Sequence, residues 1–267
     1  MKFKLADVVE WKKAEWEGKL REVPDEEWES LARQNPAKNT NLHKKIKACK
    51  YPLVIIGELR RRNPFQPSSA DPIDVVERGE LWIDSGIDAI SVWTDQEHFE
   101  GKGNDLLELI EFSQTQTKNI PLIYHDVILY PVQIVDALKN GASAIMLFVE
   151  ALDATQLDDL YACALTADMD CIFVVQNAEQ LNQILMFDPS VICINNNDIE
   201  TGLPDLSICE KLLPKVPATA VSIAWGGITN QEAATRIKQG GANAVIVGNE
   251  LIESTDPEQL IGLLHSC

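Results

Sequence analysis

The chain has 267 residues, 45% of them hydrophobic, and no apolar run approaches the ~20 residues that a membrane-spanning helix needs. An excess of 41 Asp and Glu over 23 Lys and Arg gives a formal net charge of −18, which disfavours nucleic acid and anionic membranes as partners. The charged N-terminus lacks the apolar core of a signal peptide, so we expect a cytoplasmic protein; a plastid location would require a transit peptide removed before this numbering begins.

Residues 1–50 predict an N-terminal helical extension. The segment LADVVEWKKAEWEGKL places apolar residues at helical spacing, with Lys and Glu on the opposite face. A second helix is predicted from Pro24, because proline and acidic residues are favoured in the first turn. We expect this extension to pack on the domain that follows it.

Residues 51–267 contain eight short apolar runs separated by amphipathic segments. Runs of this kind are typical of strands buried on both faces, and eight alternations of strand and helix favour a (β/α)8 TIM barrel over an open sheet. No GxGxxG follows a strand, so a dinucleotide-binding fold has little support. The predicted strands are Leu53–Glu58, Ala89–Trp93, Pro121–His125, Ala144–Val149, Cys171–Val175, Val191–Asn195, Ala220–Ala224 and Ala244–Gly248.

The cysteines and histidines predict no metal site. The chain has six cysteines, without CxxC or other metal-binding spacing, and four scattered histidines. We expect the cysteines to be reduced thiols, and we expect no metal and no cofactor. The cysteines are Cys49, Cys163, Cys171, Cys193, Cys209 and Cys267.

The last two strand ends predict a phosphate site. Gly226 and Gly227 end one strand, and Gly248 and Asn249 end the next. In this fold the loops after strands 7 and 8 frequently bind phosphate through backbone N–H groups, and glycine lets the backbone approach the anion closely. The alternative is that these glycines only make tight turns between strand and helix.

Two further strand ends carry side chains suited to catalysis. Glu58 and Arg60 have the same parity, so both can face the mouth of the barrel, where Arg60 could grip a phosphate or instead pair with Glu58. His125 is placed at the end of the third strand, where an imidazole can act as acid or base. The alternative for His125 is a structural histidine with satisfied hydrogen bonds.

The order and spacing of these segments resemble the indole-3-glycerol-phosphate synthase family nearly end to end. LVIIGELRRRNP resembles the family's first strand, I-A-E-V-K-x-x-S-P-S, and ISVWTDQEHFEGKGNDL resembles its S-V-L-T-(D/E)-x-x-Y-F-x-G segment. PLIYHDVILYPVQIVDALKNGASAIMLFVEAL, VICINNNDI and AWGGI are similar to the family's third, sixth and seventh strand regions.

The resemblance implies a carbon–carbon lyase of tryptophan biosynthesis, a carboxy-lyase without redox or metal cofactor. The family closes the ring of a carboxyphenylamino-deoxyribulose phosphate with loss of carbon dioxide and then of water. Glu58 and Asn195 match a glutamate and an asparagine that position the reacting centre. Gly227 and Gly248 match phosphate-loop glycines, and Asn249 takes a usual serine place.

Several family positions are exchanged in this chain. His125 stands where the family has its general-acid lysine, and Val174 where it has a glutamate that transfers a proton. Asn197 replaces an arginine, and Trp225-Gly226 replaces Glu-Ser. We expect Val174, Asn197 and Trp225 to line the pocket.

Near the first strand, Arg60 replaces a lysine, whereas Asn63 and Phe65 replace two serines around Pro64. Arg60 keeps the positive charge of the family lysine. We expect Arg60 and Asn63 to contribute to binding of the phosphorylated substrate.

Three functions follow from this combination. The first is a divergent synthase with His125 as replacement acid. The second is a non-catalytic relative that binds a phosphorylated ligand (a pseudoenzyme). The third is a barrel enzyme that acts on another sugar phosphate. Each has a phosphorylated small molecule as partner, and we expect a monomer or weak homo-oligomer.

Overall fold

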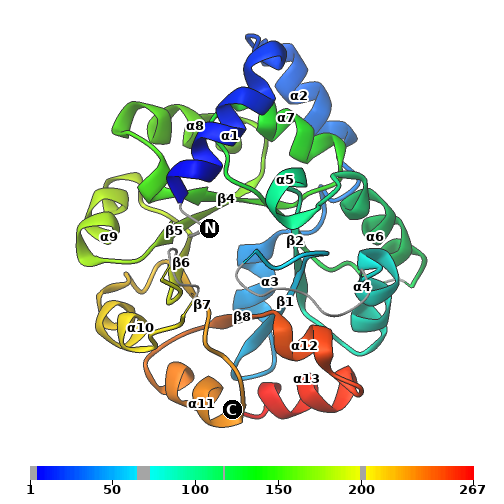
Figure 1. The fold of residues 1–267 in the computed structure, drawn as a ribbon, viewed down its shortest axis with the longest axis vertical. Helices are drawn as coiled ribbons and strands as arrows, with labels where there is room; N and C mark the ends of the chain where they lie inside the picture. Colours follow the sequence, from blue (N-terminus) through cyan, green and yellow to red (C-terminus); the bar gives the residue numbers. More distant parts are fainter. Residues whose placement is uncertain (1–4, 65–72, 117, 199–202) are drawn as a thin grey trace.

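Eight parallel strands form a closed ring in the computed structural model, which describes residues 5–64, 73–116, 118–198 and 203–267. Each strand pairs with its neighbour in chain order, and β1 pairs with β8 to close the barrel, with the helices outside (Figure 1). This confirms the predicted (β/α)8 barrel. The strands are β1 Val54–Leu59, β2 Ala89–Trp93, β3 Leu122–His125, β4 Ala144–Phe148, β5 Asp170–Val175, β6 Val191–Asn195, β7 Val221–Trp225 and β8 Ala244–Val247.

The predicted strands differ from the observed ones by at most one residue at either end. The difference at β7 matters for the site, because Trp225 belongs to the strand instead of the loop after it. Trp225 is held there by its register with Asn195 on one side and Ile246 on the other. Strand parity therefore fixes the direction of the Trp225 side chain.

Helices follow the strands, and polar side chains cap several of them. The side chains of Asp74, Asp153, Asn177 and Asn230 accept hydrogen bonds from backbone N–H groups in the first turns of their helices. Short 3-10 segments lie at Glu17–Lys19, Val149–Ala151, Leu185–Phe187 and Leu213–Lys215. The helices are α1 Leu5–Trp16, α2 Asp25–Gln34, α3 Leu42–Ala48, α4 Val75–Asp84, α5 Gln96–Phe99, α6 Asn104–Thr115, α7 Pro131–Lys139, α8 Ala154–Thr166, α9 Ala178–Ile184, α10 Ser207–Leu212, α11 Gln231–Gln239, α12 Asn249–Glu253 and α13 Pro257–His265.

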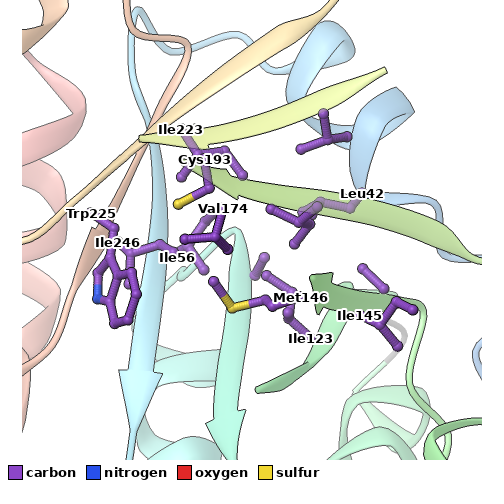
Figure 2. Close-up of a cluster of buried hydrophobic side chains, with 14 of the residues drawn as sticks. Leu42, Ile56, Ile123, Ile145, Met146, Val174, Cys193, Ile223, Trp225 and Ile246 are labelled. Atoms are coloured by element: carbon purple, nitrogen blue, oxygen red, sulfur yellow. The ribbon is translucent and has the colours of Figure 1, made fainter. Parts of the chain in front are cut away.

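The interior of the barrel is packed with apolar side chains. Figure 2 shows Val174, Cys193 and Met146 pointing into the space that the strands enclose, and all three are buried. Alternate residues of each strand point inward, so the same parity that fills this layer places the strand-end side chains at the mouth.

The N-terminal extension contacts both ends of the barrel. In α3, Leu42 is fully buried, and the backbone N–H of His43 donates to Asp170, the first residue of β5. In α1, the ammonium of Lys12 pairs with Asp95 and Asp126, which lie in the loops after β2 and β3. Helix α3 therefore covers the amino-terminal end of the strands, and α1 covers the mouth.

Within the parts of the chain that the structure describes, no helix is both long and apolar enough to cross a membrane.

Candidate functional site

A cavity of about 370 Å³ opens at the mouth of the barrel, where the strands end. Its walls come from α1, from the ends of six strands and from the loops that follow. The position is the one where this fold carries its reacting groups. The lining residues are Leu5, Val8, Glu58, Arg60, Asn63, Trp93, Phe99, Val127, Phe148, Asn195, Asn197, Leu203, Pro204, Trp225, Gly226, Gly227, Ile228, Thr229, Ile246, Gly248, Asn249 and Glu250.

Glu58 is clamped between two indole rings. The Nε1–H of Trp93 donates to Oε1 of Glu58, and the Nε1–H of Trp225 donates to Oε2, both at 2.8 Å. Burial alone would raise the pKa of Glu58, but the charge of Arg60 and the two indole donors outweigh it and hold the pKa below its usual range. The carboxylate is therefore ionised, with a donor on each oxygen.

Arg60 links Glu58 to the loop after β8. Its Nη1 lies 2.5 Å from Oε1 of Glu58, and its Nη2 donates to Oδ1 of Asn249. A Cβ on Gly248 would lie 2.8 Å from Nη1 of Arg60, so a larger residue there would force the guanidinium to shift. The anticipated alternative, a pair between Arg60 and Glu58, is thus present within the predicted phosphate region.

His125 lies beneath the cavity and does not line it. The imidazole is fully buried, stacks on Trp93 with ring centroids 3.6 Å apart, and shares a hydrogen bond of 2.9 Å between Nδ1 and the Ser91 hydroxyl. Burial and the Arg60 charge lower the pKa of His125 to about 3, against the attraction of Glu58. At neutral pH the ring is uncharged, and no described residue bonds to its Nε2.

Val174 also lies below the cavity. It is buried in β5 and faces the barrel interior (Figure 2), so the strand parity assigned from the sequence holds, but the side chain is not part of the lining. Phe148, the register partner of Val174 on β4, and Trp225 line the wall, with ring centroids 6.1 Å apart in an edge-on arrangement. The position that the resemblance assigns to proton transfer therefore carries a valine, with aromatic rings in the wall beside it.

The three consecutive asparagines that begin at the last residue of β6 stabilise the loop after it. Oδ1 of Asn195 accepts from the backbone N–H of Asn197 at 2.9 Å, and the side chain of Asn196 bridges the carbonyl of Gly226 and the N–H of Cys209. Asn195 and Asn197 line the cavity, whereas Asn196 is fully buried. Asn197 also accepts at its carbonyl from Gln176, which ties the ends of β5 and β6 together.

The two glycines after β7 adopt backbone conformations that favour glycine. Gly226 has φ +95° and Gly227 has φ +78°. A Cβ on Gly226 would lie 2.5 Å from the amide of Asn197, and one on Gly227 would lie 2.9 Å from Pro204. Both positions therefore favour glycine for the turn itself, and both glycines also line the cavity.

The remaining predicted residues lie at the rim or outside the described ranges. Asn63 and Asn249 line the cavity. The exchange at position 65 lies outside the described residues. Within the described ranges, no group of three or more His, Cys, Asp or Glu side chains is arranged to hold a metal ion.

Sequence reasoning missed Trp93, Phe148 and Glu250. Trp93 stands where the quoted S-V-L-T segment has leucine, and that exchange was the available signal. Glu250 directly follows the predicted phosphate loop and lines the cavity. Among the described lining residues, the charged side chains are Glu58, Arg60 and Glu250, so carboxylates outnumber cations.

Comparison with known proteins gives a consistent result over nearly the whole chain. The family model described as indole-3-glycerol phosphate synthase matches residues 5–264. A protein of that name from Opitutus terrae is 31% identical over 258 residues, which cover 97% of each chain. Another of that name, from Bacillus cereus, is 34% identical over 203 residues, or 76% of this chain and 78% of that protein.

Among solved structures, a thiamine phosphate pyrophosphorylase from Pyrococcus furiosus superposes with a TM-score of 0.59 over 84% of this chain and 96% of that chain. A structure titled "Native KDPGal structure" gives a TM-score of 0.56 over 79% and 92%. Their sequence identities are 15% and 14%, so these similarities concern the barrel fold alone.

Proposed function

The chain belongs to the indole-3-glycerol phosphate synthase family, and we propose that it binds a phosphorylated ligand of that pathway without performing the ring closure. One observation carries this proposal: both oxygens of Glu58 are bonded by indole donors, and Arg60 also pairs with that carboxylate. With three donors already on its two oxygens, this carboxylate has little bonding capacity left for a substrate group, so it is poorly placed to position the reacting centre.

The absence of acid and base at the expected positions supports the same proposal. The ring closure needs a group that donates a proton to the substrate. His125 is neutral at pH 7 and is covered by Trp93, and Val174 has no proton to transfer. Each positioned acid or base contributes about 10²–10⁴-fold in rate, so the two exchanges together remove most of the catalytic advantage.

The binding half of the proposal rests on the mouth of the barrel. Arg60 supplies a planar guanidinium, and the loops with Gly226, Gly227 and Gly248 bring backbone close to the cavity. Phe148 and Trp225 add aromatic surface to the wall, whereas Trp93 is already stacked between Phe99 and His125. These groups can hold a phosphorylated aromatic compound even where no chemistry follows.

A divergent synthase is the second candidate. The ionised Glu58 and the amide of Asn195 both line the cavity, at positions where the resemblance places groups that hold the reacting centre. This candidate requires a proton donor other than His125, because the buried imidazole is uncharged at neutral pH.

One experiment separates the two. The purified protein is mixed with carboxyphenylamino-deoxyribulose phosphate, turnover is followed through the fluorescence of the indole product, and binding is measured by calorimetry. The Opitutus terrae relative serves as the positive control. We expect heat of binding without turnover above background. A rate within about tenfold of the control, smaller than the loss expected from one missing acid or base, would overturn the proposal in favour of the divergent synthase.

A further inference from the structure

Glu250 places a carboxylate of the chain itself beside the proposed phosphate site. It lines the cavity together with Arg60 and Gly248. The backbone N–H groups of Leu251 and Ile252 in α12 donate to the carbonyl of Gly248 at 3.0 Å. These two backbone donors are therefore already bonded within the turn.

The charges around Glu250 oppose a second anion. Arg60 attracts the Glu250 carboxylate, whereas Glu58 from β1 and Glu253 from α12 repel it. The guanidinium of Arg60 is itself 2.5 Å from Glu58 and bonded to Asn249. One cation thus faces two carboxylates in the cavity, before any ligand has entered.

Partial burial strengthens this conflict. Removal from water, followed by repulsion from Glu253 and Glu58, raises the pKa of Glu250 above its usual range, although Arg60 acts in the opposite direction. A proton on Glu250 removes one negative charge from the cavity.

We propose that Glu250 is a specificity-determining residue that competes with a dianionic phosphate for Arg60 and the loop after β8. The inference rests on the proposed function, since it assumes that an anion binds in this cavity. A dianion then binds only when Glu250 is protonated or displaced, so binding is linked to uptake of a proton. At neutral pH a phosphate dianion therefore binds more weakly than Arg60 and the loop after β8 alone would allow.

Inorganic sulfate is a suitable probe, because it stays a dianion at both pH values used. Sulfate is titrated by calorimetry at about pH 5 and about pH 8 into the unchanged protein and into Glu250→Gln, which keeps the shape of the side chain without its charge. Glu253→Gln is the matched control, because Glu253 lies in the same short helix but is exposed and outside the cavity. Circular dichroism verifies that each variant is folded.

The unchanged protein should bind sulfate more tightly at about pH 5 than at about pH 8. At about pH 8, Glu250→Gln should bind sulfate about tenfold more tightly than the unchanged protein does, and its affinity should rise little on acidification. Glu253→Gln should behave like the unchanged protein. Equal affinities and equal pH profiles in all three would overturn the role of Glu250 while leaving the anion site intact. If Glu250→Gln binds no sulfate at either pH, the proposed phosphate site itself is wrong, and the inference fails with it.

Discussion

The ammonium of Lys12 in α1 lies 2.9 Å from the carboxylate of Asp126 at the end of β3, and only 1% of the lysine side chain is exposed. Asp95 lies 3.0 Å from the same ammonium, and Glu15 lies 2.9 Å from it. Three carboxylates therefore share one buried cation between the helix that covers the mouth and the barrel beneath it. The pKa of Lys12 is raised well above its usual range, because these anions outweigh the effect of burial.

Replacement of Lys12 by methionine should lower the free energy of unfolding by about 3–5 kcal/mol, since it leaves buried carboxylates without their cation. Equilibrium unfolding in urea measures this change. Lys13→Met is the matched control, because its neighbour Lys13 is 51% exposed and pairs only with Glu10 among the described residues; that variant should change stability by less than about 0.5 kcal/mol. Similar losses in both variants would mean that the buried cluster does not hold α1 in place.

The stability of the protein should decrease as pH rises from about 4 to about 6 through the contribution of Asp126. Burial and the neighbouring Asp95 and Glu15 raise the pKa of Asp126 to about 6, despite the attraction of Lys12. This pKa lies above that of an unfolded aspartate, so between about pH 4 and pH 6 the native state holds a proton that the unfolded chain has released. The stabilisation that this proton gives to the native state is lost as pH rises through 6.

Urea unfolding of Asp126→Asn across that pH range should therefore show a flatter profile than that of the unchanged protein. Asp159→Asn, an exposed change on α8, is the control and should leave the slope unaltered. A slope in Asp126→Asn that equals that of the unchanged protein would exclude Asp126 as the titrating group.

Replacement of Trp225 by phenylalanine should destabilise the protein by about 1–3 kcal/mol, because Oε2 of the buried Glu58 loses its hydrogen-bond donor. The lost donor should also raise the pKa of Glu58, since that hydrogen bond favours the ionised form. Thermal and urea unfolding measure the loss. Trp11→Phe provides the control at a tryptophan that is 38% exposed. If the two variants unfold alike, the indole bond to Glu58 does not stabilise the fold.

Gly226→Ala should weaken ligand binding and reduce stability by more than Gly86→Ala does. Both glycines have positive φ, +95° and +89°, so both variants bear the backbone strain of about 1–2 kcal/mol. Only at Gly226 would the new Cβ meet another group, the amide of Asn197 at 2.5 Å, whereas nothing lies within 4 Å of a Cβ at Gly86. Urea unfolding and sulfate calorimetry of the pair therefore isolate the contact with Asn197, and equal effects would show that the contact is unimportant.

The barrel could be predicted from the sequence because strands buried on both faces appear as short, continuous apolar runs. β2 and β6 match the predicted ranges, and the other strands shift by one residue. Much of the cavity lining could also be predicted, since parallel strands bring their carboxyl ends to one face. Glu58, Arg60 and Gly248 meet there for that reason.

The contacts among strand ends could not be predicted in the same way. Trp93 and Trp225 come from β2 and β7, and their convergence on Glu58 depends on closure of the ring and on the lengths of the side chains. The charged face of α1 predicted that Lys12 would be exposed. Lys12 is buried instead, because Asp95 and Asp126 lie at the mouth and pair with it. Asp126 is 114 residues away from Lys12 in the sequence, so local periodicity could not reveal this contact.

The two indoles bonded to Glu58 also give the protein an optical reporter at its mouth. Six tryptophans are present in the chain, but Trp93 and Trp225 are the ones that line the cavity among the described residues. Their emission depends on the charge and polarity next to each ring, so a ligand that disturbs the Glu58 clamp changes the colour or intensity of the protein's own fluorescence. Binding of any such ligand in this cavity can thus be followed in unlabelled protein.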